Sequence, residues 1–175
     1  NTVTLDDMAH MVQWDGYPEA LRLKLEAYGR LYKALFAVAA RYGLRVLVTT
    51  DIMYYTPELR ARLGHRVDTV AEWFGQALRR LFESYPEVSG VVTRFGENDG
   101  LDVQGDFRSE LVLKTPHQMR RFLEHVLPVF EELGRTLFFR TWSVGIYRVG
   151  DLIWNPRTFD SVFGDGPDSL KTKIQ

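Results

Sequence analysis

The stretch Gly90-Val-Val-Thr-Arg-Phe-Gly-Glu-Asn-Asp-Gly100 is the most informative part of this sequence. It begins as a short apolar, β-branched run, which is typical of a strand buried in a parallel sheet. The run stops at Gly96, and Glu97 follows at once. In a (β/α) barrel the C-terminal ends of the strands face a common mouth, where the reactive groups gather. Glu97 is therefore the first candidate for a catalytic residue.

Helical and strand-like patterns alternate on both sides of this stretch. Apolar residues at helical spacing predict helices over residues 18–42, 69–85, 116–133 and 155–164. Short β-rich runs predict strands over residues 44–50, 88–95, 135–142 and 169–175. Strict α-β alternation with helices long enough for crossover connections indicates a parallel sheet.

Two capping-box patterns define expected helix starts. Thr69 with Glu72 predicts the start of the second helix, and Thr115 with Gln118 predicts the start of the third. Pro128 lies inside the third helix and is expected to kink it, because proline has no backbone N–H to donate.

These elements predict an α/β fold in which four parallel strands alternate with helices, as in half of a TIM-type (β/α)8 barrel. We expect one domain over residues 1–175. A complete TIM barrel usually takes about 250 residues, so the chain is expected to be a fragment or a half that needs another half. Because such a half leaves two sheet edges open, we expect a homodimer that completes the barrel. The absence of an initial Met favours a piece of a longer protein.

Composition removes several classes of function. With 22 basic and 23 acidic residues, the formal charge of −1 gives no general attraction to nucleic acid or to an anionic membrane surface. No apolar run reaches the ~18 to 20 residues of a membrane span. The chain has no cysteine, and its four histidines lack metal-binding spacing. We therefore expect no cofactor, no metal, no nucleic-acid partner and no membrane, while both a cytoplasmic and an exported location stay open.

A general acid must hold its proton near neutral pH. Burial against Phe95 and Trp142 would raise the pKa of Glu97, whereas nearby Arg94 would lower it. Asp51 ends the preceding strand and is the candidate for a second catalytic carboxylate. Glycosidases place two such groups ~5 to 5.5 Å apart for retention or ~6.5 to 9.5 Å apart for inversion. The alternatives are that Glu97 only opens a polar loop and that Asp51 caps a turn.

Aromatic residues gather at the strand ends and in the loops that follow them. Flat amphipathic rings stack on sugar faces, so this composition suits a carbohydrate ligand. Packing of the same rings onto the rim of the barrel is the alternative. The rings in question are those of Tyr54, Tyr55, Trp142, Tyr147 and Trp154.

Three segments together resemble the middle of a glycoside hydrolase barrel of the α-glucuronidase type and its relatives. They are Val91-Val-Thr-Arg-Phe-Gly-Glu97, Gly105-Asp-Phe-Arg-Ser-Glu110 and Arg135-Thr-Leu-Phe-Phe-Arg-Thr-Trp142. The resemblance covers roughly residues 44–154. It implies that Glu97 is the general acid and that Arg108, Arg140 and Trp142 belong to the site. The family's His-containing stretch after Arg108 is replaced here by Ser109-Glu110.

The sequence thus predicts a glycoside hydrolase-like protein that cleaves O-glycosidic bonds of poly- or oligosaccharides. Glu97 and Asp51 are the catalytic candidates. The candidates for substrate binding are Arg94, Arg108, Arg140, Trp142, Tyr54, Tyr147 and Trp154. One alternative is an incomplete barrel that binds carbohydrate or only self-associates. Another is an unrelated α/β enzyme with a site at a topological switch point.

Overall fold

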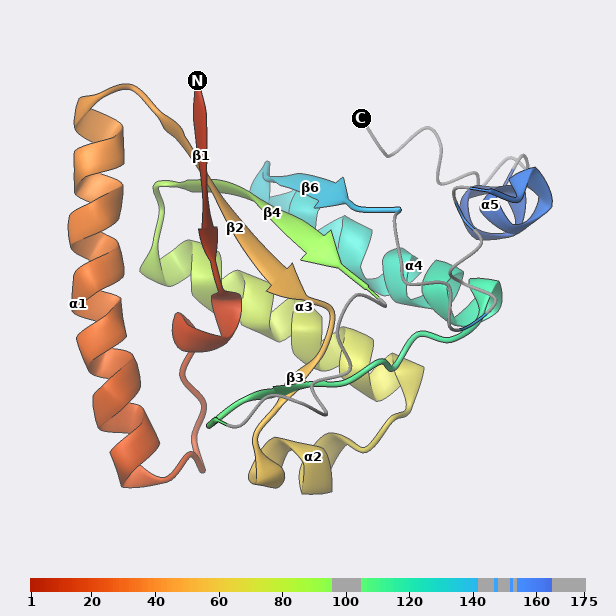
Figure 1. The fold of residues 1–175 in the computed structure, drawn as a ribbon, viewed down its shortest axis with the longest axis horizontal. Coiled ribbons are helices and arrows are strands. Elements are labelled where there is room, and N and C mark those ends of the chain that lie inside the picture. Colours follow the sequence, from red (N-terminus) through yellow and green to blue (C-terminus); the bar gives the residue numbers. More distant parts are fainter. Residues whose placement is uncertain (96–104, 142–146, 148–151, 153, 165–175) are drawn as a thin grey trace.

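A parallel sheet of four strands organises the molecule (Figure 1). The computed structural model describes residues 1–95, 105–141, 147, 152 and 154–164. The strands lie side by side in chain order, β1-β2-β4-β6, and each neighbouring pair is parallel. Their bounds are β1 (Thr2–Asp6), β2 (Arg45–Asp51), β4 (Val88–Arg94) and β6 (Thr136–Phe139). The α/β class with parallel strands alternating with helices is confirmed, and the arrangement is consistent with half of a (β/α) barrel.

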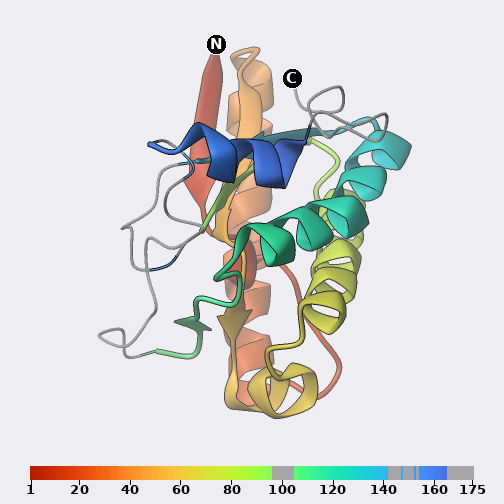
Figure 2. The ribbon, with the colours of Figure 1, turned by 90° about the vertical axis from the view of Figure 1, so that its right-hand side faces the viewer.

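Helices connect the successive strands. Figure 2 shows α3 and α4 packed together on one side of the sheet. Two shorter helical segments and an antiparallel ribbon, in which β3 pairs with β5, lie in the connections that follow β1, β2 and β4. The bounds are η1 (Met8–His10), α1 (Glu19–Arg41), β3 (Tyr54–Tyr55), α2 (Pro57–Leu63), α3 (Val67–Ser84), β5 (Arg108–Ser109), α4 (Pro116–Leu133) and α5 (Pro156–Phe163).

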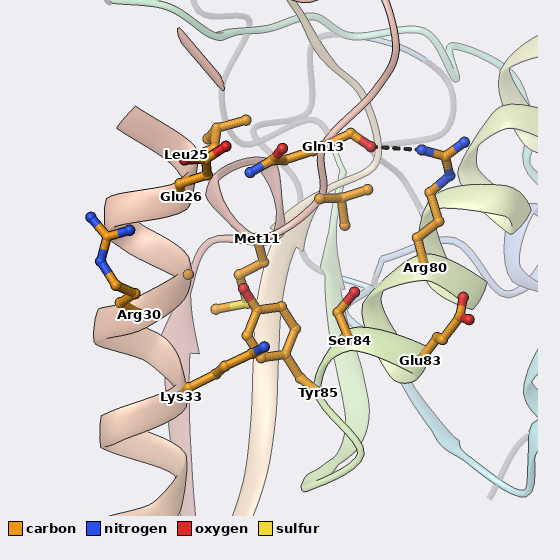
Figure 3. Close-up of a pocket in the computed structure, with 12 residues that line it drawn as sticks. Met11, Gln13, Leu25, Glu26, Arg30, Lys33, Arg80, Glu83, Ser84 and Tyr85 are labelled. Carbon is orange, nitrogen blue, oxygen red and sulfur yellow. Dashed lines mark hydrogen bonds between the residues drawn. The ribbon is translucent and has the colours of Figure 1, made fainter. Parts of the chain in front are cut away.

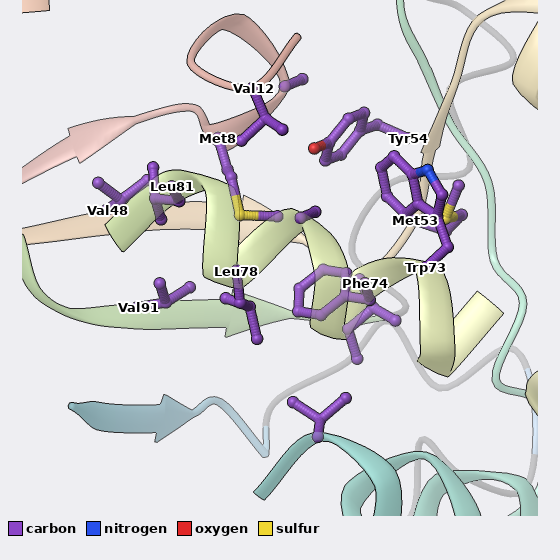
Figure 4. Close-up of a cluster of buried hydrophobic side chains, with 14 of the residues drawn as sticks. Met8, Val12, Val48, Met53, Tyr54, Trp73, Phe74, Leu78, Leu81 and Val91 are labelled. Atoms are coloured by element: carbon purple, nitrogen blue, oxygen red, sulfur yellow. The ribbon is translucent and has the colours of Figure 1, made fainter. Parts of the chain in front are cut away.

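The hydrophobic core fills the space between the sheet and α3 (Figure 4). Val48, Val91 and Leu137 align across three strands and are buried, so they form one apolar row on the helix side. Phe74 of α3 meets Phe122 of α4 edge to face at 5.3 Å between ring centroids. Burying such side chains contributes about 1.5 to 3 kcal/mol each.

The residues between the core positions point to the opposite face of the sheet, because strand side chains alternate. Thr49, Val92 and Phe138 align across this second face. In a closed barrel this is the face that points inward. Asp51 and Arg94 continue the same rows at the C-terminal ends of β2 and β4.

Two sequence predictions need correction. The N-terminal strand β1 was not expected, although Val3 and Leu5 alternate with polar residues and pack against the core. Helix α3 begins at Val67, and Arg66 takes the N-cap position without a side-chain hydrogen bond, so Thr69 is not the cap. The helix starts earlier because Val67 packs against the core. The predicted strand over 169–175 lies outside the described residues.

Other local predictions are confirmed. Thr115 and Gln118 form both halves of the capping box of α4. Pro128 lies within α4, as expected, and α4 continues to Leu133, while the kink at Pro128 stays a prediction. Asn155 caps α5 by accepting hydrogen bonds from two backbone N–H groups.

Gly90 allows β4 and β6 to approach closely. A Cβ atom at this position would lie 2.3 Å from the carbonyl oxygen of Thr136. The Arg45 guanidinium reaches the Thr136 hydroxyl at 2.7 Å and lies 5.8 Å from the Phe138 ring centroid. Since Arg45 belongs to β2 and Thr136 to β6, its side chain spans the intervening strand β4.

Gly90→Ala is expected to destabilise the fold by about 1 to 3 kcal/mol, because the added methyl group forces β4 away from β6. The free energy of unfolding from denaturant titration measures this. Gly105→Ala is the control, since a Cβ there meets nothing within 4 Å. Equal stability of the two variants would show that the strands separate at no cost.

Candidate functional site

At the ends of three neighbouring strands, two carboxylates lie close to one guanidinium. Asp51 pairs in register with Arg94, and Arg94 Nε donates to Asp51 Oδ1 at 3.1 Å. Arg94 Nη1 lies 3.5 Å from Oδ1 of Asp6, the last residue of β1. All three residues lie at the C-terminal edge of the sheet, which forms the mouth in a (β/α) barrel. We call Asp6, Asp51 and Arg94 the mouth triad.

The mouth triad is partly open to solvent. The side chains of Asp51 and Arg94 are 17% and 23% exposed, while that of Asp6 is 59% exposed. Arg94 holds the two carboxylates together, because their charges would otherwise repel. An arginine carries five N–H donors, and these two contacts employ only part of that capacity. The triad therefore offers acceptors and donors to a polyhydroxylated ligand.

Asp7 is a third carboxyl group near this edge that sequence reasoning missed. It caps η1 by accepting a hydrogen bond from the backbone N–H of Ala9. Burial raises its pKa, and the Asp51 charge adds to that effect, while the Ala9 hydrogen bond, His10 and Arg94 oppose it. The sequence did contain a signal for it, because Asp6 and Asp7 directly follow the alternating polar and apolar residues of Thr2 to Leu5.

Asp7→Asn is expected to stabilise the protein at neutral pH and to have little effect at low pH. Folding raises the pKa of Asp7 above its ordinary value of 3.8, so its contribution to stability is greatest below that value and declines as pH rises. The amide can keep the cap but carries no charge. Melting temperatures of Asp7→Asn and of the natural protein, taken from low to neutral pH, measure the difference in stability.

Asp15→Asn removes one charge from an exposed position and serves as the control. If Asp7→Asn melted at a lower temperature than the natural protein at neutral pH, the carboxylate's contacts would outweigh its burial.

The aromatic residues near the mouth form a packed layer. Tyr54 is only 3% exposed and meets Trp73 and Phe107 edge to face, at 5.4 Å and 5.6 Å between ring centroids. Its ring therefore packs on protein and is not the open sugar platform that the sequence predicts. Burial raises the pKa of Tyr54 and of Tyr17, so both hydroxyls stay protonated.

A cleft of about 370 Å³ lies beside the β3–β5 ribbon. Arg108, predicted to bind substrate, lines it together with Tyr55 and Arg60. Glu110 also lines it and is held by Arg60 Nε at 2.9 Å and His65 Nε2 at 2.6 Å. The Tyr55 hydroxyl donates to the carbonyl of Gly64 at 2.6 Å. The volume is within the usual range of small-molecule sites.

The cleft adjoins the mouth triad through Glu110. A small void beside Asp51 and Arg94 is lined by Ser109 and Glu110 on its other side. Glu110 therefore borders both spaces. Glu110 is thus the residue that the cleft shares with the void beside Asp51 and Arg94.

The remaining predicted site residues are not brought together by the described structure. Glu97 and Trp142 lie outside the described residues. Arg140 follows β6, where its backbone N–H donates to the Thr93 carbonyl at 3.2 Å. Tyr147 lies 5.0 Å from the Lys114 ammonium, and Trp154 is 79% exposed.

A larger cavity of about 720 Å³ lies between α1 and α3 (Figure 3). Lys33 of α1 and Glu83 of α3 line it, and Arg80 donates to the Gln13 carbonyl at 2.8 Å. It is also lined by Met11 to Gln13, just after η1, and by the end of α3, so it belongs to the layer of helices. Neither this cavity nor the 370 Å³ cleft is lined by the mouth triad, and we prefer the cleft because it contains Arg108, a predicted substrate-binding residue.

Comparisons of the chain with protein-family models, with curated proteins and with solved structures gave no match. Within the described ranges, no cluster of three or more His, Cys, Asp or Glu side chains could hold a metal ion. No helix in that part of the chain combines the length and apolarity required to span a membrane.

Proposed function

We propose that this chain is a glycoside hydrolase-like half barrel that acts on a poly- or oligosaccharide at the C-terminal edge of its sheet. The convergence of Asp6 and Asp51 on Arg94 at that edge is the observation that supports it most directly. The short motifs around Glu97 and Arg108 that resemble glycosidase barrels give independent support.

In this proposal Glu97 is the general acid. It follows Arg94 by three residues, so the chain leads directly from the mouth triad to this carboxyl group. Glu97 would give its proton to the glycosidic oxygen as the bond to the anomeric carbon breaks. Asp51 would be the second carboxylate, which activates water in an inverting reaction or attacks the anomeric carbon in a retaining one.

The 370 Å³ cleft is the proposed place for the sugar beside the cleaved bond. Arg108 would donate hydrogen bonds to its hydroxyl groups, since a guanidinium is a donor only. The partly exposed donors of Arg94 would fix the neighbouring sugar.

Glu97→Gln is expected to lower kcat by roughly 10² to 10⁴, because the amide cannot donate a proton. Aryl glycosides with good leaving groups should lose least, since their leaving oxygens need little protonation. Turnover of aryl glycosides and natural oligosaccharides measures both effects. Glu87→Gln is the control, because it makes the same change at an exposed position just before β4. An equal loss on every leaving group would contradict the acid role.

Arg108→Gln is expected to weaken oligosaccharide binding about 10-fold, the effect of losing one or two charge-assisted hydrogen bonds. Calorimetric titration measures it. Arg62→Gln on α2 removes an exposed guanidinium that does not line the cleft and serves as the control. Equal affinity of the two variants would remove the cleft from the proposal.

The second candidate is a barrel half that binds carbohydrate without turnover. The pairing of Asp51 with Arg94, and of Glu110 with Arg60 and His65, favours it, because these carboxylates already have partners within the protein. Binding that depends on Arg108, together with no turnover on any glycoside, would select this candidate.

A further inference from the structure

Large exposed apolar side chains are concentrated in two parts of the chain, α1 with its C-cap and the stretch from β6 to α5. Five belong to α1 and its C-cap, beside the outer strand β1 (Figure 1). The others lie on β6 and in the segment that leads from it to α5. Within the described ranges, all eight residues of this kind fall into these two groups and are 38% to 79% exposed: Leu23, Leu31, Leu35, Val38 and Tyr42, and Phe138, Tyr147 and Trp154.

Helix α1 has two unlike flanks. Leu25, Tyr32 and Phe36 mark its buried face. With about 100° between successive residues, Glu26 and Lys33 fall on the flank that lines the cavity shared with α3. Four exposed apolar residues fall on the other flank, which we call the α1 stripe (Leu31, Leu35, Val38 and Tyr42), whereas Leu23 lies opposite the buried face. The flank toward α3 is therefore polar, and the flank away from α3 is apolar from Leu31 to Tyr42, after Lys24 nearer the start of the helix.

Strand pairing leaves the same two edges open. Among the described strands, β1 pairs only with β2, and β6 pairs only with β4. A free edge presents backbone donors and acceptors to a further strand. The α1 stripe borders one edge and Phe138 belongs to the other. A partner at each edge would therefore both pair with the open strand and bury the exposed apolar side chains.

We propose that two copies of this chain join edge to edge around a two-fold axis that coincides with the axis of the barrel. β6 of each copy would pair with β1 of the other, which closes an eight-stranded parallel barrel. A single rotation makes both junctions identical and leaves no edge open. The α1 stripe and Phe138 would bury apolar surface at the two junctions, and the new strand pairs would add backbone hydrogen bonds.

In the proposed dimer, both copies contribute residues to the mouth of the barrel. The Arg140 backbone lies at the C-terminal end of β6, bonded to the Thr93 carbonyl of β4. A neighbouring β1 would end there with the partner's Asp6. Each copy's Asp51 and Arg94 would then face a second set across the barrel. This assembly does not depend on the proposed sugar chemistry, because oligomeric state is measured without turnover.

Light scattering over a range of micromolar concentrations tests the proposal. The natural chain is expected to be a closed dimer. Leu31→Glu with Leu35→Glu should raise the dissociation constant about 100-fold or more, since it places charges in the α1 stripe. Ala37→Glu introduces a charge at an exposed position outside the α1 stripe and should leave the dimer intact. Phe138→Glu on β6, at the other edge, should also dissociate the dimer.

Circular dichroism and melting temperature show whether each variant remains folded, as expected for changes at exposed positions. A natural chain that stays monomeric would overturn the proposal, and so would a dimer that survives the double substitution. A dimer sensitive to the α1 stripe but not to Phe138→Glu would indicate pairing of two α1 helices instead. A series of oligomers larger than the dimer would indicate that the copies join into open-ended assemblies. That result would also overturn the proposal.

Discussion

The parallel register between β2 and β4 is the constraint on which the rest of the molecule depends. It aligns Val48 with Val91 on the helix side and Asp51 with Arg94 on the other side. A slip of one residue would exchange the faces, exposing the valines and burying charged groups against α3. The apolar core thus determines where the charged residues lie. The candidate site is a consequence of core packing rather than of loop conformation alone.

The mouth triad brings three charged groups together at a moderate cost in folding free energy. Asp51 is well covered, yet Arg94 compensates its charge through a direct hydrogen bond. Asp6 stays largely exposed, so its charge needs little compensation. Asp7 differs, because its burial is opposed only in part by the Ala9 hydrogen bond and its neighbours. Raised acid pKa values of this kind are found both at functional sites and at buried caps.

Much of the fold could be predicted from the sequence because periodicity and capping act locally. The capping box at Thr115 and the cap at Asn155 involve residues within a few positions of one another. β1 escaped notice because only Val3 and Leu5 mark its short alternation, and its stability comes from pairing with β2. Thr69 had the right chemistry for a cap, but the packing of Val67 placed the helix start earlier.

The candidate site was less accessible to sequence reasoning. Asp51 and Arg94 were correctly expected at strand ends, but their pairing is a contact across 43 positions of the chain. Asp6 joins them only because β1 lies beside β2. The burial of Tyr54 depends on Trp73 and Phe107, which come from two other segments. Such contacts have no local signature, since they are set by the tertiary arrangement.

The Glu110 clamp also affects how this protein could be redesigned. Glu110 binds Arg60 and His65, and its backbone N–H donates to the Met53 carbonyl at 3.0 Å. The segments after β2 and β4 are therefore joined by side chains as well as by the β3–β5 ribbon. Transplanting one of them alone into another scaffold would leave either a carboxylate, or a guanidinium and an imidazole, without partners. For recombination between barrels, the two segments form a single exchangeable unit.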